Sequence, residues 1–520
     1  MATATTPDQT AVPGSPRAPD DRAFFGHPRG LSTLFFTEMW ERFTYYGMRA
    51  ILILFMTAPA AAGGLGFDTG KAGVIYGTYT AFVYLMSLPG GWVADRFLGQ
   101  RRATLYGGTV IMLGNLCLAI PSAELFYPGL FLIIIGTGLL KPNVSVMVGQ
   151  LYGQEDHRRD SAFSIFYMGI NLGAFLSPLV CGWLAQSSQF RGVLAGLGLR
   201  PEHSWHWGFG AAALGMLFGL IQYLMGWKHL GEAGMHPAPA KSPEDAARAR
   251  RLLRNGVLLS VGLFGLLAVL SGTGVLEVTP ERVGNWFGVL LFGTAIGFFV
   301  WLFASGGWTR AERKRLVVIA VLFFGAAVFW SVFEQAGSTL NLFAERSTAN
   351  TLFGFDFPAS WFQSLNALFI IVLAPVFAAL WVKLGSRNPS SPAKFTVGLF
   401  FVALGFAVLI VAAQLAAAGQ RVSPLWLTVT YLLHTIGELC LSPVGLSAMT
   451  RLAPARVAGL MMGVWFLAAS VGNYLGGRIA GFYEAFSLSG LFTAVTLYAL
   501  AAALVMAALV RPIRRMMERE

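Results

Sequence analysis

Six ionisable side chains lie in the first strongly apolar stretch of the chain, residues 31–56. They are two carboxylates, two guanidiniums and two phenols, belonging to Glu38, Glu41, Arg42, Tyr45, Tyr46 and Arg49. A stretch of this length can cross a bilayer as a helix. Charges at that depth are costly, so such groups usually face the protein interior and take part in function. Carboxylates beside arginines can exchange an ion pair for a proton, which indicates proton-linked chemistry.

Helical geometry places these groups on one side. At about 100° per residue, all of them except Tyr46 share an arc of roughly 100°, and Tyr46 lies at its edge. This polar stripe can line a cavity while the other faces contact lipid or neighbouring helices. The alternative is a self-neutralising ion-pair ladder that only fixes helix packing, but a packing role rarely needs so many charges.

Two later apolar stretches in the first half also carry polar groups. Lys141 lies well inside its stretch, and Pro142 frees a backbone carbonyl beside it. A lysine there needs a carboxylate partner or a polar cavity, unless it reaches the membrane surface. Tyr167 and Asn171 are four residues apart and share a helix face. The Asn171 amide either lines the cavity or bonds a neighbouring helix, and the sequence favours neither.

The second half supplies acidic groups. Glu334 shares a helix face with Trp330, Ser338 and Asn341. We expect this carboxyl to be protonated or to have an arginine partner, and Arg49 is the available cation.

A further stripe combines His434, Glu438 and Ser442. A histidine in such a place more often packs between helices, whereas Glu438 is harder to explain by packing. Trp465 is as consistent with the core as with a pocket wall. A cavity between cations of the first half and anions of the second would suit a zwitterion.

The composition indicates the class of protein. The chain has 520 residues, of which 55% are hydrophobic and 12% charged, and its mean hydropathy is +0.62. These values indicate an all-α polytopic membrane protein. The net charge of +12 is arranged as a membrane-orientation signal, so we expect the lipid bilayer and not nucleic acid as a partner. The three cysteines match no metal or redox spacing.

Fourteen apolar windows predict fourteen transmembrane helices. With the N-terminus inside, 27 of the 37 lysines and arginines fall in inside segments, 6 in outside segments and four within helices. This asymmetry predicts a multi-pass protein of the cell inner membrane with both termini in the cytoplasm. The predicted parts are a disordered cytoplasmic tail (1–28), a six-helix bundle (29–228), a cytoplasmic linker (229–251), an inserted helical hairpin (252–304), a second linker (305–315), a second six-helix bundle (316–512) and a cytoplasmic tail (513–520).

A faint internal repeat supports two equivalent halves. The turn around Asp95 and Arg96, after the second predicted helix, resembles the short basic turn around Lys383 and Arg387 in the second half. Two parallel six-helix repeats are the architecture of major facilitator transporters. We expect Asp95 and Arg96 to act structurally, by joining adjacent helices at the inner face.

The motifs resemble those of one family, the proton-dependent oligopeptide transporters of the major facilitator superfamily. Residues 38–46 match its ExxERFxYY motif, residues 166–173 match its FYxxINxG motif, and residues 437–443 resemble its tenth-helix segment. The similarity extends from about residue 24 to 512. Bacterial members often carry two additional helices after the sixth, as predicted here.

The resemblance implies a proton-coupled symporter that imports di- and tripeptides by alternating access, without a cofactor. It assigns proton coupling to Glu38, Glu41, Arg42 and Glu334, with Glu334 and Arg49 pairing in alternation. It assigns peptide binding to Arg49, Tyr45, Tyr46, Tyr79, Lys141, Asn171, Trp330, Asn366, Glu438, Ser442 and Trp465. Animal members carry a histidine in the second helix; none occurs here, so the proton route would use carboxylates.

Two other functions compete with this interpretation. A divergent member of the family would carry another anionic solute, such as nitrate. A membrane enzyme would use the buried carboxylates as acid and base, but the sequence has no metal-ligand cluster, nucleophile elbow or phosphate loop. The sequence leaves the oligomeric state and the peptide preference open.

Overall fold

The computed structural model describes residues 21–153 and 156–518, and these residues are almost entirely helical. The N-terminal half comprises α1 (Arg29–Thr57), α2 (Thr69–Val93), α3 (Gln100–Ala119), α4 (Phe126–Gln150), α5 (Arg158–Gln186), the short α6 (Ser188–Gly196) and α7 (Ser204–Gly226). The hairpin helices are α8 (Pro243–Gly272) and α9 (Pro280–Ala304). The C-terminal half comprises α10 (Arg310–Phe333), the short α11 (Thr339–Ser347), α12 (Gln363–Leu384), α13 (Ser391–Ala417), α14 (Leu425–Leu452), α15 (Met461–Ala480) and α16 (Leu488–Glu518).

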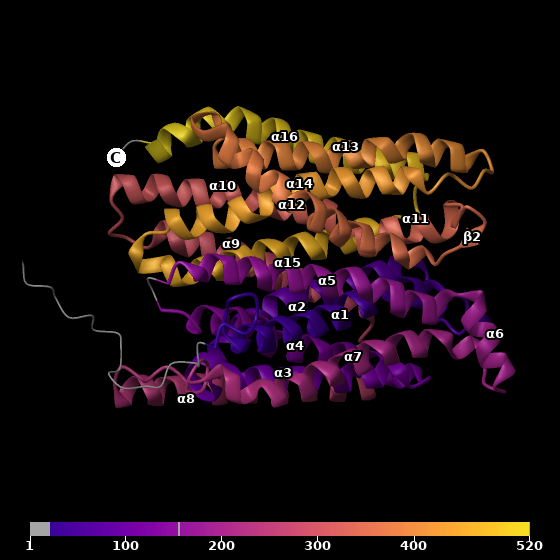
Figure 1. Ribbon diagram of the computed structural model, residues 1–520, viewed down its shortest axis with the longest axis horizontal. Helices are drawn as coiled ribbons and strands as arrows, with labels where there is room; N and C mark the ends of the chain where they lie inside the picture. The colour runs from indigo at the N-terminus through magenta and orange to yellow at the C-terminus, as the bar shows by residue number, and fades with distance from the viewer. Residues whose placement is uncertain (1–20, 154–155, 519–520) are drawn as a thin grey trace, which may run out of the picture.

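The two halves form two layers of roughly parallel helices that lie side by side (Figure 1). One small hairpin, of β1 (Thr351–Leu352) and β2 (Phe355–Asp356), lies at the end of the molecule opposite the C-terminus. In the described part of the chain, ten helical segments are long and apolar enough to cross a membrane. Helix α1 is not among them because it carries the charged cluster. The predicted all-helical polytopic architecture is confirmed at this level.

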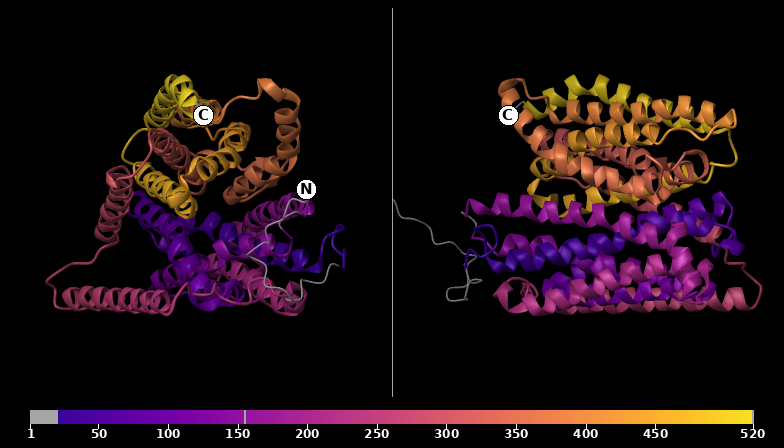
Figure 2. Two further views of the ribbon diagram at one scale, coloured as in Figure 1. Left: turned by 90° about the vertical axis from the view of Figure 1, so that its left-hand side faces the viewer. Right: turned by 45° about the vertical axis from the view of Figure 1, so that its right-hand side comes forward.

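The hairpin helices differ in how they pack. In α8 only Ala249 is buried, and the helix lies at the edge of the molecule (Figure 2). Helix α9 contacts both halves: Phe287 stacks on Phe82 of α2 with ring centroids 3.9 Å apart, and Asn285 accepts a hydrogen bond from Arg478 of α15 at 2.8 Å. Helix α9 therefore lies across the seam between α2 and α15.

Three segments predicted as tails or linkers contain ordered structure. In the predicted tail 1–28, residues 1–20 lie outside the described residues; within 21–28 most side chains are exposed, but His27 is buried and contacts Tyr152 at 2.8 Å. The structure therefore differs from the predicted disorder within 21–28, where Phe24 packs on Phe35 with ring centroids 5.6 Å apart and His27 is buried. The linker 229–251 is helical from Pro243, and the tail 513–520 continues α16 to Glu518.

The turn after α2 anchors the predicted linker to the N-terminal half. Arg96 forms an ion pair with Asp245 of α8 at 2.6 Å, and Gln100 donates to Asp95 at 2.8 Å. Buried Arg101 donates to the backbone oxygens of Gly231 and Ala233. Gly99 reverses the chain with a φ of 73°, which favours glycine. Asp95 and Arg96 thus join the turn to α3 and to the start of the hairpin.

The first crossing of the C-terminal half is interrupted by a break in its helix. Helix α10 ends at Phe333 and is followed by a 3₁₀ turn, η6 (Glu334–Gly337), before α11 begins at Thr339. Glu334 is the first residue of this break. Breaks of this type are tolerated at membrane depth where they line a cavity. The sequence predicted a continuous helix here.

Glycines allow the helices of the N-terminal half to approach closely, which gives a stability prediction. A Cβ added at Gly136 of α4 would lie 2.6 Å from the Gly107 oxygen of α3. We expect Gly136→Val to force these helices apart and to destabilise the protein by about 1–3 kcal/mol or more. Thermal unfolding of the purified protein measures this. Gly262→Val, in α8, is the matched control because nothing lies within 4 Å of that position. Equal effects of the two substitutions would contradict the proposed packing.

Candidate functional site

A central cavity lies between the two halves. Six helices (α1, α2, α5, α10, α12 and α14) and η6 supply its walls, so no single segment of the chain forms it. The lining residues are Tyr46, Arg49, Tyr84, Pro178, Trp330, Phe333, Glu334, Ala336, Gln363, Asn366, Tyr431, His434 and Glu438. Most are aromatic, polar or charged, which is the composition of a site for a polar solute rather than of a lipid-facing groove.

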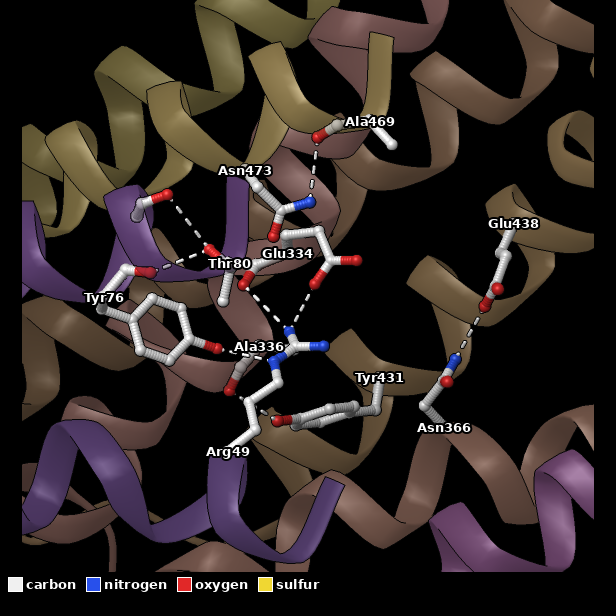
Figure 3. Close-up of polar contacts among 11 residues, drawn as sticks. Arg49, Tyr76, Thr80, Glu334, Ala336, Asn366, Tyr431, Glu438, Ala469 and Asn473 are labelled. Atoms are coloured by element: carbon white, nitrogen blue, oxygen red, sulfur yellow. Dashed lines mark hydrogen bonds and ion pairs between the residues drawn. The ribbon is translucent and has the colours of Figure 1, made fainter. Parts of the chain in front are cut away.

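The centre of this cavity wall is an ion pair between Arg49 of α1 and Glu334 of η6 (Figure 3). Both residues are about 95% buried, with exposures of 4% and 5%. Arg49 Nε also donates to the Tyr76 hydroxyl at 2.6 Å, and Arg49 Nη2 lies 3.4 Å from the Glu334 backbone oxygen. The expectation that Glu334 has an arginine partner is therefore met by a contact that joins the two halves.

Burial makes this pair sensitive to the loss of either charge. A buried guanidinium or carboxylate left alone is strongly destabilised, whereas together the two charges compensate each other. The aromatic groups around Arg49 add to its stabilisation, since the Tyr46 ring lies 5.8 Å from the guanidinium carbon. Any group that displaces Glu334 must therefore provide a replacement negative charge or hydrogen-bond acceptors for Arg49.

A second polar group lies across the cavity from this pair. Asn366 of α12 donates to the Glu438 carboxylate and to the Thr435 hydroxyl of α14, both at 3.0 Å (Figure 3). Among the described residues, Glu438 has an amide partner and forms no ion pair. Its carboxylate is thus placed to accept hydrogen bonds from a cationic ligand.

The remaining charges of the α1 stripe form a separate cluster. Arg42 Nε pairs with Glu38 at 3.1 Å and contacts Glu41 more closely. All three side chains are buried, at 4%, 4% and 0% exposure for Arg42, Glu38 and Glu41. None of them lines the cavity in this structure. One guanidinium therefore serves two carboxylates of its own helix.

Lys141 has aromatic neighbours in the structure. Its ammonium lies 3.8 Å from the centre of the Tyr84 ring and 6.0 Å from that of Phe466. These contacts suit a lysine with no ion pair among the described residues, because ring faces attract cations. Tyr84 lines the cavity, so Lys141 contacts a residue of the cavity wall but does not line the cavity itself.

The other predicted binding residues are placed in different ways. Trp330 lines the cavity. The Trp465 ring packs edge to face on the Trp330 ring, with centroids 6.5 Å apart. The hydroxyls of Tyr45 and Tyr79 are buried and have no hydrogen-bond partner in the part of the chain that the structure describes, whereas Ser442 is half-buried. Asn171 donates to the Tyr167 backbone oxygen of its own helix at 2.9 Å. Residues Tyr45, Tyr79, Asn171, Ser442 and Trp465 do not line the cavity in this structure.

Several residues of the cavity wall or in contact with it were not predicted from the sequence. They are Tyr76, which bonds Arg49, and the lining residues Tyr84, Gln363 and Tyr431. A signal existed for two of them: Tyr76 and Tyr84 are eight residues apart and so share a helix face. His434 was interpreted as a packing residue, and its ring does pack on Phe406, with centroids 5.4 Å apart, although it also borders the cavity.

Comparisons with known proteins agree on one family. The family model described as "POT family" matches residues 101–257 and 291–498. The peptide transporter YePEPT of Yersinia enterocolitica is 42% identical over 97% of this chain and 98% of its own length. A di-/tripeptide transporter of Lactococcus lactis subsp. cremoris is 38% identical over 96% of this chain and 98% of its own.

A solved structure gives the same result in three dimensions. The crystal structure of a peptide transporter POT in complex with sulfate superposes with a TM-score of 0.87 at 43% identity, covering 96% of this chain and 98% of that one. The family expected from the sequence motifs is therefore confirmed. Taken with the buried charge pair between two helical halves, these comparisons show that the chain belongs to the POT family and is a membrane transporter, not an enzyme.

Proposed function

We propose that this protein is a proton-coupled symporter that imports di- and tripeptides by alternating access. The observation that carries the proposal is the buried Arg49–Glu334 ion pair between the two halves, in the wall of the central cavity. The relatives named as peptide and di-/tripeptide transporters align over nearly the whole chain, which supports peptides as the substrate class. Protons are the coupling ion, and no cofactor is required.

The proposed arrangement in the membrane has fourteen crossings. Each of α1–α5, α7–α10 and α12–α16 contains at least 20 residues, enough to span the hydrocarbon core. The distribution of lysines and arginines favours an inner-membrane protein with both termini in the cytoplasm. In this orientation the end of the molecule that carries α6 and the β-hairpin faces outward.

The proposed coupling step is an exchange of partners at Arg49. Protonation of Glu334 removes its negative charge and releases the Arg49 guanidinium, which then binds the carboxylate of the peptide. Because one carboxylate replaces the other as the partner of Arg49, no lone guanidinium is left in the low-dielectric interior. Glu38, Glu41 and Arg42 form a second carboxylate–guanidinium cluster that would relay protons on the inner side.

The two ends of the peptide would bind opposite walls. Arg49 and Lys141 would hold the carboxylate, and Tyr45, Tyr46 and Tyr79 would surround it. Glu438, Asn366, Asn171 and Ser442 would hold the ammonium group. Trp330 and Trp465 would border the peptide side chains. The acceptor-rich Glu438 and the cationic Arg49 on opposite sides support this polarity.

A second candidate cargo is another anionic solute, such as nitrate. Such a solute would use the cationic wall at Arg49 but would leave Glu438 without a role. The presence of Glu438 in the cavity wall therefore favours a zwitterionic peptide. Competition of dialanine uptake by nitrate distinguishes the two cargoes.

The exchange mechanism predicts the behaviour of Glu334→Gln. This variant cannot carry the proton, so uptake of dialanine driven by a proton gradient into liposomes should fall at least tenfold, whereas peptide exchange without a gradient should persist. Glu277→Gln is a suitable control because Glu277 is an exposed residue between α8 and α9. Gradient-driven uptake at the wild-type rate in Glu334→Gln would eliminate the proposed switch.

The polarity of the site predicts a selective effect of Glu438→Gln. This substitution keeps the shape and the hydrogen bond with Asn366 but removes the charge that would pair with the peptide ammonium. Hydrogen bonds to charged groups contribute about 1.5–3 kcal/mol, so we expect the KM for dialanine to rise at least tenfold. Binding of N-acetyl-dialanine, which lacks the ammonium, should change little. An equal loss for both peptides, measured by competition, would show that Glu438 does not recognise the amino terminus.

A further inference from the structure

The backbone oxygen of Ala50, the residue after Arg49, accepts two hydrogen bonds from the opposite half. Asn341 Nδ2 of α11 donates to it at 2.7 Å, and Gln363 Nε2 of α12 donates to it at 3.2 Å. Ala50 is fully buried and Asn341 is 1% exposed, while Gln363 is half-buried at the cavity wall. Two neutral amides thus converge on the helix turn that carries Arg49.

These contacts place two different kinds of bond on consecutive residues of α1. Glu334 and Asn341 belong to the same interrupted crossing, on η6 and α11. Glu334 contacts the side chain of Arg49, and Asn341 contacts the backbone of Ala50. The ion pair depends on the charge of Glu334, whereas an amide–carbonyl hydrogen bond involves no titrating group.

The proposed cycle requires such a distinction. Once a peptide has entered from outside, Arg49 holds its carboxylate and is separated from Glu334, and the outward-facing end must then close without the help of this ion pair before the inner side opens. While Arg49 is bound to the peptide, its ion pair with Glu334 is absent and cannot hold the halves together. Resting on the proposed function, we propose that Asn341 and Gln363 are positioning residues that hold α1 against the C-terminal half when the Arg49–Glu334 pair is broken.

The chemistry of these bonds suits reversible closure. Ala50 lies inside α1, where its oxygen also accepts the N–H four residues on. When the halves separate, that oxygen keeps its helical partner, so no buried acceptor is left without a hydrogen bond. A single bond of ordinary strength then biases the equilibrium between closed and open forms about fivefold.

Two further contacts between the halves follow the same pattern. Ser364 donates to the Phe175 oxygen at 2.8 Å, and the Trp361 indole donates to the Leu179 oxygen of α5 at 3.1 Å. In each case the donor is a side chain of the C-terminal half and the acceptor a helix carbonyl of the N-terminal half. Asn341 and Gln363 differ from these because their shared acceptor adjoins Arg49.

A reporter cysteine at the closed end tests the proposal. Ser360 of the 3₁₀ turn η7 (Ala359–Phe362) is fully buried, and its hydroxyl packs against Gly182 of α5. Ser360→Cys is introduced into the full chain after Cys117, Cys181 and Cys440 are replaced by alanine. The measurement is the rate of labelling by a membrane-impermeant methanethiosulfonate, with and without Glu334→Gln and Asn341→Leu.

The proposal expects the two changes to act together. Glu334→Gln alone should label slowly, and adding Asn341→Leu should raise the rate about fivefold, with a smaller rise where Glu334 is intact. Gln363→Leu should add to the effect, and Gln363→Asn, which shortens the donor, should give an intermediate rate. Asn115→Leu is the control, since the Asn115 amide donates to Ile111 of its own helix.

Two results would overturn the proposal. Glu334→Gln alone labelling as fast as the combined variant would show that the ion pair by itself closes the halves. Equal rates with Asn341→Leu and Asn115→Leu in the Glu334→Gln background would show that the Ala50 contacts do not hold α1. Labelling requires no peptide, so a failure of dialanine uptake would count against the transport proposal and leave this comparison intact.

Discussion

The buried ion pair between Arg49 and Glu334 is the constraint on which the rest of the structure depends. Two charges in a membrane interior are tolerated only while they compensate each other. One charge belongs to each half of the molecule, so the ion pair can form only when the two halves are in contact at this point. Electrostatics and the relative position of the halves are therefore linked by one contact.

The fold provides the conditions for that link. The break after Phe333 turns Glu334 toward α1, and α2 supplies the Tyr76 hydroxyl that fixes the guanidinium. Close glycine contacts bring helices together within a half, as at Gly107 and Gly136, and also across the halves, as between Gly77 of α2 and Gly477 of α15. Between them, side-chain donors meet helix carbonyls that are already bonded, and such contacts form and separate at small energetic cost.

The inserted hairpin adds a restraint at the seam between the halves. Helix α9 contacts α2 through Phe287 and α15 through Asn285, whereas α8 contacts little beyond the start of the helix. The Arg96–Asp245 pair ties that start to the turn after α2. The hairpin is therefore attached mainly to the N-terminal half and reaches the C-terminal half along a single helix.

The sequence by itself determined the class of the protein, its all-helical polytopic architecture and most of the charged residues of the site. Hydropathy and charge act locally along the chain, so a run of apolar residues or a carboxylate within it is visible without coordinates. The motif around Glu38, Glu41 and Arg42 also identified the family.

Tertiary structure alone decided which charges meet: Arg49 pairs with Glu334 in the cavity, while Arg42 stays with the carboxylates of its own helix. It also decided that Asn171 bonds its own helix and that Tyr76 joins the site. Helical periodicity gives the face on which a residue lies, but the rotation of each helix and the break at η6 are set by packing between segments hundreds of residues apart.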